Sequence, residues 1–311
     1  TDNVAIGEAS LDAVTTGSDN TAVGDNAAGA ITTGDDNVAI GSGALLVATT
    51  VSDMTAVGSA ALTANTTGTA NTAVGYNAGL AVTTGANNTA LGYQSLKTAT
   101  TTSGNTAIGE NALRDCTGTE NTAIGSSAMY DGAGGNENVA IGNDALIVNA
   151  GNQNVAIGGD SMKANTTGAN NTAVGFEALK TNTTTSQNTA IGMYSLKVNI
   201  AANNTGVGYN ALGANTTGTE NVAVGKSAGA AVTTGSYNTA LGASALDVST
   251  TGASNVAVGN NALGANTTSS NNTAVGTDAL VVNTAANNTA VGKSALAANT
   301  TGTSNVAVGY A

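Results

Sequence analysis

The sequence NTAVG at residues 20–24 decides the fold of this 311-residue chain. The pattern Asn, Thr or Val, Ala, a branched aliphatic residue and Gly occurs nineteen times with few exceptions, always 16 or 17 residues apart. This period is too short for a helical hairpin or a propeller blade, but it fits one coil of a solenoid that stacks on its own copies. The repeat therefore predicts an all-β, parallel β-roll or β-solenoid of about 18 coils, with residues 1–311 forming one continuous array.

Within each copy of the five-residue phrase, alternation predicts a strand. The Thr or Val and the branched residue before Gly point to one side, and Asn and Ala point to the other. Stacked asparagine amides are expected to hydrogen-bond along the array, and the glycines to turn the chain. The asparagines of this structural ladder include Asn20, Asn37, Asn71, Asn121, Asn171, Asn221 and Asn272. The turn glycines include Gly24, Gly41, Gly75, Gly125, Gly175, Gly225 and Gly276.

A second apolar segment follows each turn glycine. Ala or Ser stands three residues after the glycine, Leu usually follows it, and a Thr-Thr-Gly turn leads to the next Asn. This spacing predicts a second short strand, so that each coil has two strands and two turns. The interior would then hold one Val or Ile, one Leu and a few smaller methyl groups per coil. At ~25 cal/mol per Å² of buried apolar area, this barely offsets ~1–2 kcal/mol of backbone entropy per residue.

The Ala of the phrase offers the burial that a thin coil lacks. It is replaced only once, by Gly206, so the position is expected to press against another backbone. We expect three chains, intertwined or side by side, to pack these small residues around a common axis as a homotrimer. The candidate trimer-packing residues include Ala22, Ala39, Ala73, Ala123, Ala173, Ala223 and Ala274.

Charge and composition argue against several classes of function. The 19 acidic and 7 basic residues give a net charge of −12, which opposes binding to nucleic acid or anionic lipid. No stretch is long and apolar enough for membrane insertion by this segment. Without histidine, neither a Ser-His-Asp triad nor a His-bearing metal site can form. We therefore expect no enzyme activity, no catalytic or metal residues and no cofactor.

Two local features of the sequence resemble binding sites. Asp35-Asp36 and the stretch GAGGNEN at 132–138 are similar to calcium-binding loops, but they do not recur in every coil, which favours polar turns. Several aromatic residues follow a turn glycine by one or two places, where they could contact sugar or protein. Their scatter along the sequence favours separate exposed side chains over one shared patch. These residues are Tyr76, Tyr93, Phe176, Tyr194 and Tyr209.

The phrases NVAIGEAS at 3–10 and NTAIGSSA at 121–128 resemble the head repeats of YadA-like trimeric autotransporter adhesins. The longer form NTAVGxxALxxNTTG is similar to repeats in phage and viral tail fibres. The resemblance covers the whole chain, although the adhesin repeats are shorter. It implies a left-handed β-roll in a homotrimeric fibre, located outside the cell, on the cell surface or on a virion. The chain is then expected to be one segment of a longer fibre: a rigid rod that presents or forms a region for attachment to a host glycan or protein receptor.

Two other functions remain open. An ice-binding solenoid is suggested by the column of Thr at the second place of the phrase, although Val replaces Thr in seven copies. An enzyme acting on polysaccharide along a solenoid groove would need facing carboxylates, which the sequence does not cluster.

Overall fold

The computed structural model describes residues 2–310, and the chain divides into two compact units, Thr1–Gln153 and Asn154–Ala311. Residues 1 and 311, which bound the predicted array, lie outside the described residues. Over residues 2–310 the fold is a parallel β-solenoid of about 18 turns, with three-residue strands and no helix. The prediction of one continuous array concerns how the two units join, and it stays a prediction.

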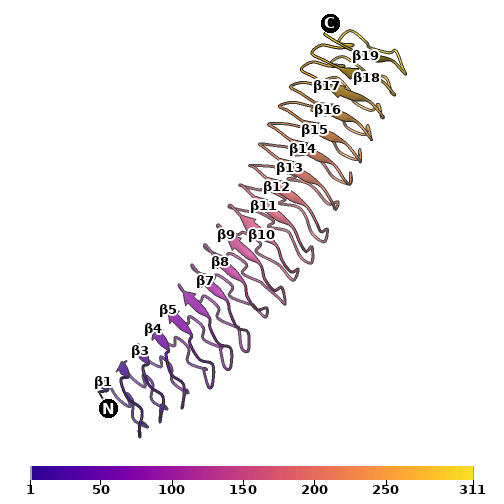
Figure 1. Ribbon diagram of the computed structural model, residues 1–311. Helices are drawn as coiled ribbons and strands as arrows, with labels where there is room; N and C mark the ends of the chain where they lie inside the picture. The colour runs from indigo at the N-terminus through magenta and orange to yellow at the C-terminus, as the bar shows by residue number, and fades with distance from the viewer. Residues whose placement is uncertain (1, 311) are drawn as a thin grey trace. The chain divides into compact units, whose positions relative to one another are not determined.

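Each unit consists of strands that follow one another in chain order (Figure 1). The first unit contains β1 (Val4–Ile6), β2 (Thr21–Val23), β3 (Val38–Ile40), β4 (Thr55–Val57), β5 (Thr72–Val74), β6 (Thr89–Leu91), β7 (Thr106–Ile108), β8 (Thr122–Ile124) and β9 (Val139–Ile141). The second contains β10 (Val155–Ile157), β11 (Thr172–Val174), β12 (Thr189–Ile191), β13 (Thr205–Val207), β14 (Val222–Val224), β15 (Thr239–Leu241), β16 (Val256–Val258), β17 (Thr273–Val275), β18 (Thr289–Val291) and β19 (Val306–Val308).

Within each unit, equivalent residues of successive coils lie directly beside one another. In the pairing of β11 with β12, Ala173 is opposite Ala190, and all described strand pairs inside a unit keep this register in parallel. Because the side-chain period of a strand is two, this register places identical positions in straight columns on each face of the sheet. The repeat in the sequence thus becomes a set of side-chain columns in space.

The predicted second strand is wrong. From Gly7 to Gly292, the residues two and four places after each turn glycine lie in the left-handed region of backbone space, as at Asn210 (φ 54°) and Leu212 (φ 51°), so this part of the coil is a run of turns. Its amides still bond to the next coil, because the N–H of Leu212 donates to the carbonyl of Ala228 at 3.0 Å. The left-handed conformation costs a Leu about 1–2 kcal/mol. Complete burial of its side chain, worth about 1.5–3 kcal/mol, offsets this.

The interior is thin and lies between the strand and this run of turns. The strand Ala column faces the Ala or Ser and the Leu of the turn segment. At Gly206, which takes the Ala place in β13, a Cβ would meet Ser195 Oγ at 2.5 Å and Leu196 Cγ at 3.3 Å. The branched strand residues, expected to contribute to the interior, instead lie on the outer face, where they are half-buried or exposed. The expected alternation is therefore present, but its apolar bulk faces outward.

The turn glycines allow successive coils to approach closely. Gly24 has φ 134°, and a Cβ there would lie 2.7 Å from the carbonyl carbon of Gly41 in the next coil. The other six predicted turn glycines also have φ between 130° and 138°. No other residue fits this combination of backbone conformation and contact with the neighbouring main chain.

Candidate functional surfaces

The outer face of the strands carries two columns of side chains. One contains the Thr or Val at the first strand position, and the other contains the branched residue at the third. Over the described strands, these columns hold only Thr, Val, Ile and Leu, so the face carries no charge. Among the third-position residues of β2 to β18, the most exposed are 37–46% accessible: Ile40, Leu91, Ile124, Ile191, Leu241 and Val291. Each unit therefore presents an uncharged strip of methyl and hydroxyl groups along its strands.

The assignment of the strand alanines to packing between chains is wrong. These side chains are completely buried within the single chain, because they fill the narrow space between the strand and the turn segment. No surface of theirs is left for a neighbouring chain. The residues concerned are Ala22, Ala39, Ala73, Ala123, Ala173, Ala223 and Ala274.

The asparagines that directly precede the strands form hydrogen-bonded ladders inside the units. Asn20 Oδ1 accepts from the main-chain N–H of Asn37 at 3.0 Å and from its Nδ2 at 2.9 Å, and Asn37 Nδ2 donates to the carbonyl of Val51 at 2.8 Å. The same pattern of bonds places Asn71, Asn121, Asn171 and Asn221 in ladders, while Asn272 takes part through its N–H and Oδ1. These buried amides satisfy polar groups at one corner of each coil.

A second buried asparagine column was missed by the sequence reasoning. Asn215 Nδ2 donates to Asn199 Oδ1 at 2.6 Å and to the carbonyl of Gly218 at 2.9 Å. The signal was the Asn that often precedes the Thr-Thr turn, seven residues after the turn glycine. In other coils an apolar residue such as Ile31, Val82 or Val232 fills this place.

Cys116 also lies in this second column. Its side chain is fully buried, and burial raises the pKa of the thiol to about 11 against the hydrogen bonds that it makes with Gly118 and Asn121. Because the thiolate is the reactive form, this environment makes the cysteine inert at neutral pH.

The two segments that resemble calcium-binding loops are turns with their own hydrogen bonds. Asp35 Oδ1 accepts from the N–H of Ser18 at 2.7 Å and from its Oγ at 3.1 Å, which joins two successive turns. In the stretch 132–138, Asn136 Oδ1 accepts from the N–H of Thr119 at 2.8 Å. Residues 2–310 contain no group of three or more Cys, Asp or Glu side chains placed to hold a metal ion.

The five aromatic residues singled out in the sequence lie in two clusters. Tyr76 and Tyr93 stack in the first unit with their ring centroids 5.6 Å apart. In the second unit, Tyr194 lies between Phe176 at 5.9 Å and Tyr209 at 6.0 Å, with both pairs edge to face. The expected separation of these side chains is wrong, because coils that are 16 or 17 residues apart in sequence are neighbours in space.

A chain of ion pairs borders the second cluster. Glu177 binds Lys180 Nζ at 2.6 Å and Lys197 Nζ at 2.7 Å, and Asp160 binds Lys180 Nζ at 3.1 Å and Lys163 Nζ at 2.9 Å. The hydrogen bonds from Lys180 and Lys197 lower the pKa of Glu177, and the hydrogen bond from Lys163 lowers the pKa of Asp160. Both carboxylates are therefore ionised at neutral pH, and their two negative charges compensate most of the charge of the three lysines.

Comparisons with models of known protein families and with curated proteins find no match for this chain. Within residues 2–310, no helix long and apolar enough to cross a membrane is present.

Proposed function

We propose that this chain is a non-catalytic segment of an extracellular homotrimeric fibre, located on a cell surface or a virion. It acts as a rigid rod that presents or forms a region for attachment to a host glycan or protein receptor. Its coil is left-handed, as the resemblance of its repeats to adhesin heads and tail fibres implies. The observation that supports this proposal best is the uncharged outer face of the strands, which offers a repeating apolar strip to identical neighbours.

The packing surface of the trimer is the outer strand face and not the alanine column. A surface free of charge is unusual in a chain with 26 charged residues, and these residues lie on the turns instead. An exposed apolar strip this regular favours burial against another surface. Copies of the same chain have the same repeat and can therefore pack against this strip coil by coil. Closed rotational symmetry then limits the number of chains in the assembly.

Sedimentation equilibrium tests the assembly directly. The folded chain should have three times its monomer mass of 29.6 kDa. Replacing Val174, Ile191 and Val207 together with Lys places charge at the third position of three successive strands and should produce monomers. Replacing the exposed turn residues Thr167, Thr184 and Thr217 with Lys adds the same charge and should leave the trimer intact. A monomeric wild-type protein would contradict the proposal, as would equal dissociation of the two variants.

Ice binding is the second candidate function, because the Thr column lies on the same outer face as the branched column. A regular array of hydroxyl and methyl groups can order water, although Val interrupts the Thr column at Val38, Val139, Val155, Val222 and Val256, among others. Thermal hysteresis at micromolar protein would favour this function over the fibre. Its absence in a folded sample would remove it.

A further inference from the structure

The aromatic cluster of the second unit contains Phe176, Met193, Tyr194 and Tyr209, and we call it the ring cluster. Main-chain bonds between neighbouring coils set its order: the N–H of Tyr194 donates to the carbonyl of Phe176 at 3.1 Å, and the N–H of Asn210 donates to that of Met193 at 3.0 Å. Phe176, Met193 and Tyr209 are 42–46% accessible. Three successive coils thus present apolar side chains at one corner of the solenoid.

The ring cluster is held in place before any ligand binds. Tyr194 contacts a ring on each side, and Lys197 Nζ lies 4.7 Å from its ring centroid. Glu177 fixes Lys197 in turn through the ion pair at 2.7 Å. Since these side chains already contact one another, a ligand that stacks on them has fewer side-chain rotamers to immobilise.

Tyr194 departs from the pattern of its column. It stands two residues after the turn glycine with φ 63°, a backbone conformation that is unfavourable for a bulky residue. The other described coils have small or polar residues at this place, such as Asn210, Ser227 and Asn261. Its ring contacts with Phe176 and Tyr209 are the interactions that accompany this unfavourable backbone conformation.

The chemistry of the ring cluster fits a sugar. A pyranose has an apolar C–H face, which stacks on an aromatic ring, and hydroxyl groups around its edge, which bond to charged and polar groups. The ring cluster offers both, with aromatic rings beside the ion pairs of Glu177 and Asp160. Successive rings stand on successive coils, about 4.8 Å apart along the array, so a chain of sugars can follow them.

Charge on the molecule favours a neutral sugar. Lys163, Lys180 and Lys197 are paired with the two carboxylates of Asp160 and Glu177, so only one positive charge at the border of the ring cluster is left to attract an anion. The net charge of −12 also opposes a polyanion. A protein partner fits less well, because the ring cluster is small compared with the ~800 Å² that each partner of a stable protein complex usually buries.

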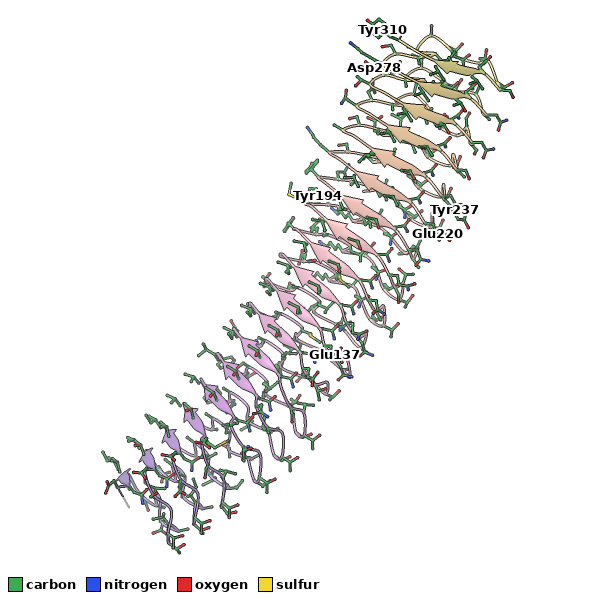
Figure 2. All side chains as sticks on the ribbon, viewed as in Figure 1. Glu137, Tyr194, Glu220, Tyr237, Asp278 and Tyr310 are labelled. Carbon is green, nitrogen blue, oxygen red and sulfur yellow. The ribbon has the colours of Figure 1, made fainter. Side chains whose placement is uncertain are left out.

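We propose that the ring cluster is a binding site for a neutral glycan chain, with sugar rings stacked on Tyr194 and Tyr209. This inference rests on the attachment role proposed above and adds the class of ligand and the residues that contact it. The second unit also supplies a matched control. Tyr237 is exposed and has φ 61°, but Figure 2 shows it at the opposite edge of the strands from Tyr194.

Affinity electrophoresis of the full chain in native gels tests the site, with dextran, yeast mannan and laminarin as neutral glycans and alginate as the acidic one. At least one neutral glycan should retard the protein more than alginate does, and retardation should persist at 500 mM NaCl. The Tyr194→Asn variant suits the left-handed backbone and should bind about ten-fold more weakly, since one stacked ring is lost. The Tyr237→Asn variant should bind as wild type does.

Failure to bind all three neutral glycans would overturn the inference. Stronger binding to alginate would do so too, as would equal weakening by the two tyrosine variants. Thermal unfolding of each variant verifies that it is folded. Sedimentation of the same samples separates this inference from the proposed fibre. A monomer that binds glycan would refute the trimer alone, and a trimer that binds none would refute the site alone.

Discussion

The strand alanines are the most tightly enclosed residues of each coil. Ala173 is completely buried in β11, and Ser161 Oγ, from the turn segment of the preceding coil, donates to its carbonyl at 3.2 Å. Only a methyl group fits between the strand and the turn segment. Its neighbour Val174 points outward and is half-buried, so the two positions separate the effects of inner and outer packing.

The Ala173→Leu variant should therefore lose about 1–3 kcal/mol of unfolding free energy through overpacking. Urea unfolding followed by circular dichroism measures the change. The Val174→Leu variant adds less bulk on the open side and should stay close to wild type. Equal losses in both variants would show that the inner and outer faces have been misassigned.

One residue of the second asparagine column has no asparagine beside it in either adjacent coil. Asn65 is fully buried, and neither Nδ2 nor Oδ1 has a hydrogen-bond partner, while the same place holds Ala48 and Val82 in the adjacent coils. The Asn65→Val variant should gain about 1 kcal/mol of unfolding free energy, because it removes a buried polar group without partners.

Asn215 is the matched comparison for Asn65. It donates to Asn199 and Gly218, so Asn215→Val should lose about 1–3 kcal/mol by leaving those acceptors with fewer donors. Urea unfolding of both variants gives the sign of each change. Destabilisation of the same size at both positions would contradict this account.

Cys116 should make the free energy of unfolding depend on pH in the alkaline range. Burial raises the pKa of its thiol to about 11 in the folded state, whereas in the unfolded state the thiol ionises near pH 9.0. Because the unfolded state releases the proton first, the unfolding free energy should fall between pH 9 and 11, by at most about 1.4 kcal/mol per pH unit. The Cys116→Ala variant should lack this slope, and a slope that persisted in it would refute the assignment.

The sequence predicted the strands well and the rest of each coil poorly. The strands follow from strict alternation, as in Thr172, Ala173 and Val174, and the period fixed their parallel register. Alternation does not show which face is inside, and the small size of Ala, which predicts contact between chains, reflects the thin interior of the coil. The second strand failed because Leu212 and its equivalents carry no sequence signal for left-handed backbone.

The candidate surfaces were less predictable for a related reason. Tyr194 and Tyr209 are 15 residues apart, and only the stacking of their coils places the rings 6.0 Å from each other. The asparagine ladder could be anticipated because each amide meets its own copy in the next coil. Tyr194 stands two places after its turn glycine and Tyr209 one place after, so the contact between these two rings depends on the path of the turn.

Each coil is a unit of stability, and this can be tested by removing one. Deleting residues 239–255 joins Asn238 to Val256, so that Asn238 Oδ1 can accept from Asn272 in place of Asn255. All ladders of the second unit then continue in register, and the shortened protein should keep its cooperative unfolding. Deleting residues 239–247 removes half a coil and should prevent folding of the adjacent coils. Circular dichroism and urea unfolding distinguish the two deletion variants. Equal loss of folded structure in both would contradict the account of each coil as an independent unit of stability.

Charge is divided unequally between the two compact units. Residues 1–153 contain 14 acidic and 2 basic residues, a net charge of −12, whereas residues 154–311 contain 5 of each. In the first unit Asp19, Asp36 and Asp53 occupy the same place in consecutive coils, about 4.8 Å apart along the array. Like charges at that spacing repel, and the repulsion acts against the folded coils of this unit alone.

Salt should therefore stabilise the two units to different extents. Raising NaCl from 10 to 500 mM shortens the screening length from about 30 Å to less than 10 Å, which weakens the repulsion between the exposed carboxylates. Hydrogen exchange of peptides from β2 to β4 should slow as salt is added, because their local opening becomes less favourable. Peptides from β13 to β15 lie in the unit without net charge and should change little. Equal slowing in both sets would show that salt acts on burial in general, and the repulsion between these aspartates would then have no measurable effect on the fold.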